Sequence, residues 1–212
     1  MQRRSVPFLA LTAVLLSSSA ARADTSFSIE PIVAITKQKS DPSIEGTFTR
    51  TFEKSPFGLS GFWWVTGGWA EGYGGPTYAP KPWLTLGTGV GLEQNNGFSK
   101  LQARYNVNFT VSTATKTGFP ILVAGSLEMN TDTFHHGDTD GMWYDILATL
   151  TMHPNFTFGA RGRRYIGFGP LAQMNIPELH TKMWVLLGVV DAERRLDTFK
   201  TFTGLTGLTL EL

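Results

Sequence analysis

Residues 100–112, KLQARYNVNFTVS, alternate without a break between polar and apolar side chains. A two-residue period is typical of a β-strand, because successive side chains point to opposite faces of a sheet. This strand is about twice as long as the usual five or six residues. The chain must therefore cover one long apolar face while the opposite face stays strongly polar. The polar side chains are Lys100, Gln102, Arg104, Asn106, Asn108, Thr110 and Ser112.

The same period recurs along most of the chain. Few stretches keep the 3.6-residue apolar stripe of a helix, and no run of 18 apolar residues follows residue 23. The sequence therefore predicts an all-β fold and excludes a helical membrane span. In addition to the two strands within 99–130, strands are predicted over 27–36, 61–79, 83–93, 142–152, 155–162, 164–175, 179–189 and 198–212.

The connections between these segments alternate in character. Tight turns are expected at 80–82, 115–118, 153–155 and 175–178, and generally longer, more polar loops at 94–98, 130–141, 161–163 and 191–197. Short turns at one end and longer loops at the other are typical of outer-membrane barrels. We therefore predict a closed antiparallel up-and-down transmembrane β-barrel of about ten strands, with both termini at the short-turn end. This count makes residues 37–60 a long first outer loop. An extra hairpin within 44–54, where GTFTRTFEK also alternates, raises the count to twelve.

The N-terminal stretch 1–23 has the composition of a secretory signal peptide. Arg3 and Arg4 precede a short apolar core over 6–16, and small residues stand at 21–23 around Arg22. We expect cleavage before Asp24, which leaves a single barrel domain over 24–212. Three of the 18 Lys and Arg lie in this stretch, so 15 basic side chains face 17 acidic ones in the mature chain. This balance gives no indication of nucleic-acid binding. The chain contains no cysteine, which excludes disulfides and thiolate metal sites.

The long two-faced strands fit a membrane better than water. In a soluble barrel or sandwich the apolar faces point inward, whereas in lipid they point outward and polar side chains line the lumen. A closed barrel also satisfies every backbone hydrogen bond in lipid. Aromatic residues near strand ends fit interfacial girdles. They are Trp83, Phe98, Phe119, Phe134, Trp143, Phe156, Phe168 and Phe202. A soluble secreted barrel that binds a ligand inside is the alternative.

The last strand, TGLTGLTLEL, places Leu208, Leu210 and Leu212 on one face. It resembles the C-terminal strand of small Gram-negative outer-membrane β-barrel proteins, although those proteins prefer a terminal aromatic where this chain has Leu212. The resemblance implies a location in the bacterial outer membrane, among its lipid and lipopolysaccharide. It also implies insertion by the barrel-assembly machinery, and it leaves the oligomeric state open.

Charged side chains on the predicted lumen face are the candidate functional residues. A narrow barrel packs such charges into a polar core of ion pairs, and a wider one uses them to line an aqueous path. Ten strands lie between these limits, so both roles stay open. By alternation the inward charges are Glu93, Lys100, Arg104, Glu128, Asp145, Arg161, Arg163, Lys182 and Glu211. We predict that a polar network of the lumen contains Lys100, Arg104, Glu128, Asp145, Arg161 and Lys182.

The hairpin around TATKTGFP allows a specific prediction of register. A three-residue loop over 116–118 puts Gly118 where a left-handed conformation is often needed. In this register the residue numbers of the two members of each cross-strand pair sum to 234. Asn106 then lies opposite Glu128, Val111 opposite Val123 and Phe109 opposite Gly125. A sum of 232 sets Arg104 opposite Glu128 directly. In both registers we predict an Arg104–Glu128 ion pair inside the barrel, extended by Asp145 on the following strand.

An enzyme is the second functional class. Some outer-membrane barrels of this size are similar to aspartyl-type proteases, lipid A deacylases and lipid A acyltransferases. The candidate segment is FHHGDTDG, with His135, His136, Asp138 and Asp140. It contains turn-forming residues and lacks the full spacing of a calcium loop, so we expect an exposed, mobile loop without a metal. No catalytic residue, cofactor or metal ligand is assigned.

The sequence therefore predicts a small porin-like channel or a structural barrel with a polar lumen. The alternatives are an outer-membrane enzyme acting on lipid A or peptides and a soluble secreted ligand-binding barrel.

Overall fold

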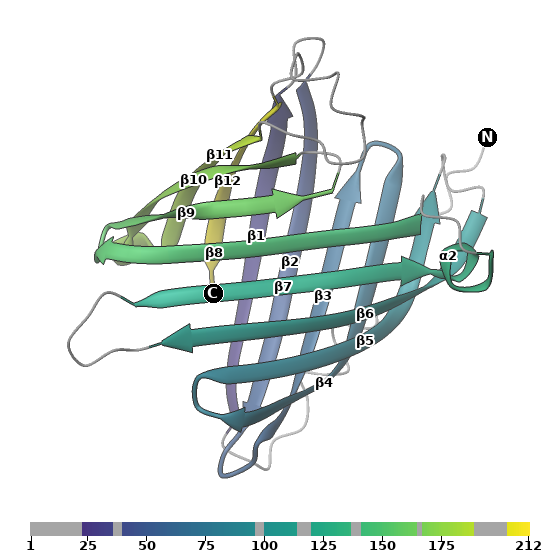
Figure 1. The fold of residues 1–212 in the computed structure, drawn as a ribbon, viewed down its shortest axis with the longest axis horizontal. Coiled ribbons are helices and arrows are strands. Elements are labelled where there is room, and N and C mark those ends of the chain that lie inside the picture. Colours follow the sequence, from purple (N-terminus) through teal and green to yellow (C-terminus); the bar gives the residue numbers. More distant parts are fainter. Residues whose placement is uncertain are drawn as a thin grey trace.

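The protein folds as a closed barrel of twelve antiparallel strands (Figure 1). A computed structural model describes residues 23–35, 40–95, 100–113, 120–136, 141–164, 167–188 and 203–212. Each strand pairs with the next one in sequence, and β1 pairs with β12, so the sheet has no free edge. The strands are β1 (Ala23–Ile35), β2 (Ser40–Phe52), β3 (Phe57–Thr66), β4 (Trp69–Lys81), β5 (Leu84–Asn95), β6 (Lys100–Thr113), β7 (Ile121–Asn130), β8 (Met142–His153), β9 (Phe156–Arg163), β10 (Gly167–Ile176), β11 (Thr181–Gly188) and β12 (Thr203–Glu211).

The two ends of the barrel differ as the sequence predicts. The β2–β3, β4–β5, β8–β9 and β10–β11 turns lie at the end where β1 begins and β12 ends, called here the terminal end. The β10–β11 turn is a short 3-10 helix, η2 (Pro177–Leu179), followed by His180 in a left-handed conformation with φ of 48°. The opposite, outer end carries the helical turn α2 (Thr131–His136) between β7 and β8. None of the helices in the described ranges is long and apolar enough to span a membrane.

The strand count of twelve matches the alternative count rather than ten, and two segments explain the difference. Residues 37–60 do not form a long outer loop, because β2 occupies 40–52 and pairs along its whole length with β1. The segment 44–54 is not a hairpin of its own, since it lies mostly within β2. Residues 61–79 are not one strand but parts of β3 and β4, which turn at Gly67 and Gly68.

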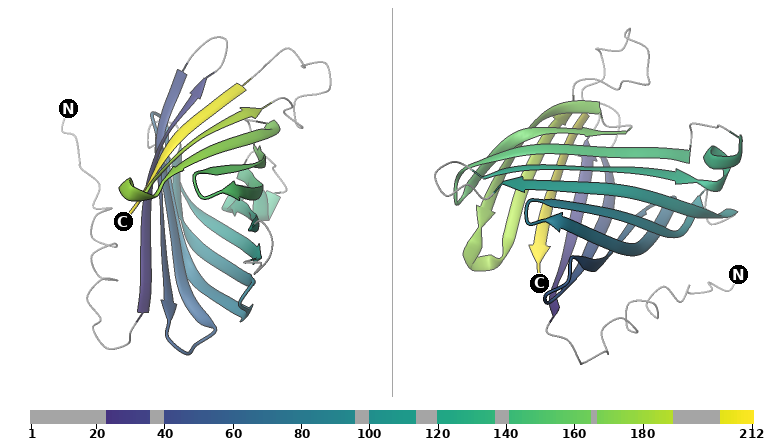
Figure 2. Two further views of the ribbon diagram at one scale, coloured as in Figure 1. Left: turned by 90° about the vertical axis from the view of Figure 1, so that its left-hand side faces the viewer. Right: turned by 60° about the horizontal axis from the view of Figure 1, so that its bottom comes forward.

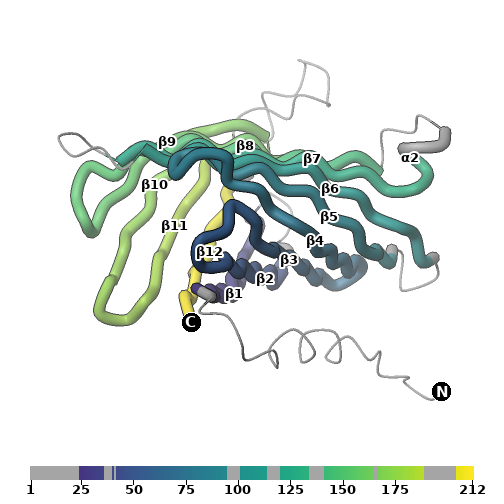
Figure 3. The backbone as a smooth tube through the Cα atoms, turned by 90° about the horizontal axis from the view of Figure 1, so that it is seen from below, coloured from purple at the N-terminus to yellow at the C-terminus, as the bar shows by residue number. Residues whose placement is uncertain are grey.

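The strands of opposite walls run in different directions. In Figure 1, β6–β9 cross the view while β1–β3 rise behind them, as expected for steeply tilted strands in a closed barrel. Figure 3 shows the end of β12 beside the start of β1. There the Leu212 backbone N–H donates to the Phe27 carbonyl at 2.9 Å. The chain therefore closes on itself at the terminal end.

The outer surface of the barrel is apolar, as a membrane-spanning barrel requires. On β6, Leu101, Val107 and Phe109 are exposed, while Arg104 and Asn106 between them are buried in the lumen. This arrangement is the reverse of a soluble barrel. Outward-facing exposed apolar side chains also include Ile35, Ile44, Val65, Leu86, Val90, Leu92, Ile121, Ile146, Phe158, Met174, Met183, Val185 and Leu187.

Three of the predicted girdle residues, Trp83, Phe156 and Phe168, are exposed. Trp143 is not part of a girdle, because its side chain is 8% exposed and lies inside the barrel. The side chains of Phe98, Phe119, Phe134 and Phe202 lie outside the described residues.

One part of the interior is apolar rather than polar. Ile32 on β1, Leu171 on β10, Trp184 and Leu186 on β11 and Leu205 on β12 form a buried cluster, called here the apolar compartment. The lumen wall is therefore polar over β2–β9, whereas β10, β11, β12 and β1 carry the apolar compartment toward the outer end and polar side chains toward the terminal end.

Candidate functional site

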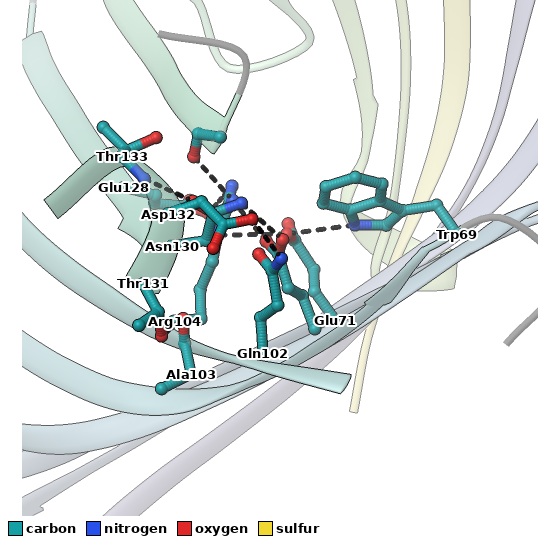
Figure 4. Close-up of polar contacts among 12 residues, drawn as sticks. Trp69, Glu71, Gln102, Ala103, Arg104, Glu128, Asn130, Thr131, Asp132 and Thr133 are labelled. Carbon is teal, nitrogen blue, oxygen red and sulfur yellow. Dashed lines mark hydrogen bonds and ion pairs between the residues drawn. The ribbon is translucent and has the colours of Figure 1, made fainter. Parts of the chain in front are cut away.

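Four charged residues from four consecutive strands meet in the lumen near the outer end (Figure 4). The Arg104 guanidinium on β6 contacts Glu71 on β4 (Nε to Oε2, 3.2 Å) and Glu93 on β5 (Nη1 to Oε2, 2.6 Å). It also contacts Glu128 on β7 through Nη2 and Oε2 at 3.0 Å. We call these four residues the Arg104 cluster. One guanidinium is thus shared by three carboxylates.

The pairing of the strands brings these charges together. Glu71 lies directly opposite Glu93 across β4 and β5, where two like charges would repel each other. Arg104 lies opposite Gly91, one step along the lumen face from Glu93. Its long side chain passes over this glycine position toward the two carboxylates. The cluster therefore depends on Arg104 as the counter-charge of opposed acids.

Neutral side chains complete the hydrogen bonding of the cluster. The Trp69 indole N–H donates to Glu71 at 3.1 Å, and the Tyr73 hydroxyl donates to Glu128 at 2.9 Å. Asn130 Nδ2 donates to Glu93 Oε1 at 2.7 Å. The Arg104 carbon Cζ also lies 5.7 Å from the Trp69 ring centroid, a cation–π distance. These contacts fix the carboxylates in place around the guanidinium.

The Arg104 cluster is joined to the outer connection between β7 and β8. Arg104 Nη1 donates to the Gly141 carbonyl at 3.1 Å, on the β8 side of this connection. Asn130 Oδ1 accepts from the Thr133 backbone N–H at 3.0 Å and so caps α2. Gln102 Nε2 donates to Asp132 at 2.6 Å (Figure 4). Both ends of the connection are thus tied to the lumen charges.

A second group of charges spans the lumen between opposite walls. Arg161 and Asp145, on β9 and β8, form a bidentate pair at 2.9 and 2.6 Å. Arg163 Nη2 on β9 donates to Glu45 Oε2 on β2 at 2.5 Å. We call Glu45, Asp145, Arg161 and Arg163 the cross-lumen cluster. Strands β2 and β9 are far apart in the order of the barrel, so the Glu45–Arg163 pair connects two walls that do not share a ladder.

Tryptophan rings pack around the cross-lumen cluster. Trp64 on β3 and Trp143 on β8 contact each other with centroids 5.2 Å apart, again between distant strands. The Arg163 guanidinium lies 5.8 and 5.4 Å from these two rings, and Arg161 lies 5.2 Å from Trp184. Charged groups and aromatic faces together fill the lumen at this level.

Burial shows that the two clusters close the lumen. Arg104 is 1% exposed, and its three carboxylate partners are 2% exposed. Solvent therefore does not reach the Arg104 cluster from either end. Toward the terminal end the lumen face carries solvent-exposed hydroxyls, with Ser26–Thr49 and Ser28–Thr47 hydrogen bonds at 2.5 and 2.6 Å. The lumen is thus an open vestibule at the terminal end and is closed toward the outer end.

The predicted register and ion pair are both present. Asn106 pairs with Glu128, and the pairs Val111–Val123 and Phe109–Gly125 also follow the sum of 234. The Arg104–Glu128 ion pair lies inside the barrel. The loop residue Gly118, for which a left-handed conformation was the expectation, lies outside the described residues.

Asp145 does not extend the Arg104–Glu128 pair, and this part of the prediction is wrong. Asp145 lies directly opposite Arg163 across β8 and β9 and is bound by Arg161 and Arg163. The two arginines on the adjacent strand β9 bind the Asp145 carboxylate, whereas Arg104 lies two strands away in the other direction.

Of the two lysines of the predicted network, the structure describes the side chain of Lys182 alone. Lys182 is at the terminal end, where it forms a half-exposed ion pair with Glu211. Lys100 begins β6 and pairs with Asn95, and its side chain lies outside the described residues.

Glu45 and Glu71 are buried lumen carboxylates that were not predicted. Glu45 stood in a segment predicted to be a loop. Glu71 stood in a glycine-rich segment predicted to be one long strand. The signal for Glu71 was present, because Trp69, Glu71 and Tyr73 alternate with the small residues Ala70 and Gly72.

The histidine-rich segment is only partly described. The backbone of His135 and His136 belongs to α2, but their side chains and residues 137–140 with Asp138 and Asp140 lie outside the described part of the chain. Within the described residues, no three His, Asp or Glu side chains are arranged to hold a metal ion. The exposed, mobile, metal-free loop stays a prediction.

The barrel is similar to two solved outer-membrane proteins. A KdgM porin matches with a TM-score of 0.53 and 12% identity, covering 86% of this chain and 98% of the porin. The Acinetobacter baumannii outer membrane protein Omp33 matches with a TM-score of 0.53 and 11% identity, covering 88% and 98%. No protein-family model matches the sequence, and no curated protein sequence matches it. At these identities the likeness shows the fold, which is that of a bacterial outer-membrane β-barrel.

Proposed function

We propose that this chain is a small porin-like channel of the bacterial outer membrane, closed in this conformation by the two charge clusters. The observation that carries the proposal is the Glu45–Arg163 ion pair between opposite walls of the lumen. An ion pair across a lumen blocks passage when it is formed and clears a path when its partners separate. The open, hydroxyl-lined vestibule at the terminal end supports a route for polar solutes up to this point.

Unpaired polar atoms beside the Arg104 cluster favour a channel over a purely structural barrel. Glu71 Oε1, Gln102 Oε1 and Asn106 Nδ2 are buried and have no hydrogen-bond partner among the residues that the structure describes. A buried polar atom without a partner costs about 1–3 kcal/mol. A static polar core gains nothing from this cost. Water or an ion that enters a transiently open lumen satisfies these atoms.

The charges of the lumen support a preference for cations. Acidic side chains outnumber basic ones in the two clusters, and Glu30, which accepts a hydrogen bond from Thr209, adds another carboxylate. Rings of carboxylates bias a pore toward cations. The basic members are Arg104, Arg161 and Arg163, and the acidic members are Glu45, Glu71, Glu93, Glu128 and Asp145.

The test is a planar-bilayer recording of the purified, folded barrel in a KCl gradient. We expect brief openings from a mainly closed level, with a reversal potential on the cation-selective side. Folded protein that inserts into the bilayer but never conducts would overturn the channel and favour the structural barrel, for which the packed lumen is the supporting observation. The enzyme acting on lipid A or peptides gains no support from any of the described residues.

We also propose the steps that deliver the barrel to the membrane. Residues 1–23 act as a signal peptide, the barrel-assembly machinery reads the end of β12, and the outward face contacts outer-membrane lipid and lipopolysaccharide. The intact mass of protein purified from outer membranes tests the first step, with a mature chain expected to begin at Asp24. A mass that retains residues 1–23 would contradict it.

A further inference from the structure

The ladder between β10 and β11 stops before the outer ends of the two strands. Pairs run from Ile176–Thr181 to Leu171–Leu186 and stop there. On its other side β10 stays paired with β9 out to Gly167–Arg163. Beyond Leu171 toward the outer end, the next residue of β10 is Pro170, which has no backbone N–H to donate to a ladder. The part of this seam beyond Leu171–Leu186, toward the outer end, is therefore held by fewer backbone hydrogen bonds than the paired part.

The seam between β12 and β1 is interrupted as well. Ladder pairs occur at Ile29–Leu210 and Ile32–Gly207, but no ladder pair includes Glu30 or Pro31, and at this gap the Thr209 hydroxyl donates to the Glu30 side chain. In contrast, β11 and β12 pair with each other without a gap from Thr181–Leu210 to Gly188–Thr203. The strand pair β11–β12 is thus a continuous unit attached to its neighbours by interrupted ladders on both sides. Figure 2 shows β12, in yellow, between β11 and β1 in the barrel wall.

The apolar compartment lies directly behind this strand pair. Trp184, Leu186 and Leu205 are its inward side chains, and they pack against Ile32 and Leu171 on the flanking strands. Leu186 is 0% exposed. Pro76 interrupts the β4–β5 ladder too, but Gly75 and Gly89 stand at that gap, with no apolar cluster behind them. An apolar compartment serves no purpose in the passage of a polar solute.

The part of the β10–β11 seam beyond Leu171–Leu186 faces lipid and has little side-chain bulk. Phe168 and Leu187 are exposed on the outward face. On the inward face the residues are Gly169 and Gly188, and the backbones are so close that a Cβ on Gly169 would lie 1.7 Å from the Leu187 carbonyl oxygen. The seam is closed by this backbone contact rather than by interlocked side chains. An outward movement of β11 therefore needs no side chain to be withdrawn there.

We propose that the apolar compartment is a binding site for a lipid acyl chain, which enters from the membrane between β10 and β11 when the strand pair β11–β12 moves outward. The compartment is built from apolar side chains, with the Arg161 guanidinium against the Trp184 ring at its edge, and its entrance opens to the hydrocarbon of the membrane rather than to either aqueous end. A flexible apolar chain is the ligand that matches both features. This binding site goes beyond the channel and does not rest on it, because it requires only that the barrel lies in a membrane.

A photo-crosslinking experiment tests the site. The folded barrel is reconstituted in phosphatidylethanolamine–phosphatidylglycerol vesicles doped with a phospholipid that carries a diazirine at the end of one acyl chain. After irradiation, adducts are located by mass spectrometry. We expect adducts on the inward residues Leu186 and Leu205 in addition to outward ones. Adducts confined to outward residues such as Val185 and Leu187 would overturn the proposal. A free diazirine fatty acid, added in a second arm, distinguishes a lipid-borne chain from a free one.

A disulfide lock tests the entrance, since the chain has no cysteine of its own. One residue beyond the last pair, Leu187 stands opposite Pro170, and the P170C/L187C variant joins the two strands there. The spacing of antiparallel strands suits a disulfide. The matched control is A172C/V185C, a paired position within the intact ladder.

Oxidation of P170C/L187C should abolish the adducts on Leu186 and Leu205, and reduction of the same sample should restore them. The control should keep these adducts in both states. Persistence of the adducts in the oxidised P170C/L187C variant would contradict entry between β10 and β11. The recovery on reduction shows in the same sample that the variant is folded.

Discussion

Arg163 on β9 and Glu45 on β2 form an ion pair across the lumen, with Nη2 and Oε2 2.5 Å apart, although 118 positions separate them in the chain. The strands that carry them share no ladder. The contact therefore depends on closure of the whole barrel and not on any local pairing. Both residues lie in the outer halves of their strands, as the Arg104 cluster does, and the buried charges close the lumen there.

Replacement of Arg104 by alanine should strongly destabilise the barrel. The change leaves Glu71, Glu93 and Glu128 buried around an empty position without their shared cation. Removal of one partner from a buried ion pair costs about 3–5 kcal/mol. The free energy of unfolding in urea, followed by the heat-dependent shift in gel mobility, measures this effect.

Lys182→Ala is the matched control, because Lys182 also pairs with a carboxylate but is 35% exposed. A pair of this kind contributes about 0–1 kcal/mol. Equal losses in the two variants would show that the Arg104 cluster is hydrated rather than buried.

Two carboxylates of the same cluster should respond differently to neutralisation. Both oxygens of Glu93 are engaged, by Arg104 and by Asn130, so an amide at this position places a donor against a donor. We expect Glu93→Gln to cost about 1–3 kcal/mol. Glu71 Oε1 has no partner, while Oε2 receives both of its contacts. Glu71→Gln keeps those contacts and removes surplus negative charge, so stability should be unchanged or slightly higher.

Urea unfolding of the two glutamine variants, side by side, measures the difference. A loss for Glu71→Gln as large as that for Glu93→Gln would refute the assignment of the unpaired oxygen.

The lumen face of β5 tolerates no side chain at Gly91. A Cβ there would lie 1.9 Å from the Gly72 carbonyl oxygen and 2.5 Å from the Tyr73 Cα, both backbone atoms that cannot rotate away. Gly91→Ala should therefore cost about 1–3 kcal/mol or more through overpacking. At Gly61 the nearest atom to a Cβ is 3.5 Å away, so Gly61→Ala should be tolerated.

The folded fraction of each glycine variant after refolding into detergent, read from unheated gel mobility, tests this pair. Equal folding of both variants would mean that β4 and β5 are farther apart than the structure has them.

The sequence predicted features that depend on local alternation. The two-residue period of β6 assigned Arg104 and Asn106 to the lumen, and one of the two registers predicted for the β6–β7 hairpin set Asn106 opposite Glu128, as the structure has it. These features need only the geometry of adjacent strands, in which a slip of one residue would turn the apolar face inward. For this reason the Arg104–Glu128 ion pair was predictable from the sequence.

Contacts across the lumen were not predictable in this way. Which residues of β2 and β9 face each other depends on strand tilt and on where β1 meets β12, and no local pattern states either. The Asp145 prediction failed for a different reason, because it overlooked Arg161 and Arg163 on the adjacent strand β9, which bind this carboxylate. The β3–β4 turn is a different case, because the Gly67–Gly68 pair is a known signal for a two-residue hairpin and was overlooked.

The central claim is that ion pairs across the lumen close a channel, and single-channel recording of the E45A/R163A double variant tests it most directly. Removal of both partners avoids an uncompensated charge, so the barrel should still fold. The control is K182A/E211A, which removes a charge pair at the terminal end. We predict that E45A/R163A stays open for a larger fraction of the time and carries a larger current than the wild type, while K182A/E211A matches the wild type. A folded E45A/R163A barrel whose open fraction and current equal those of the wild type would contradict the account.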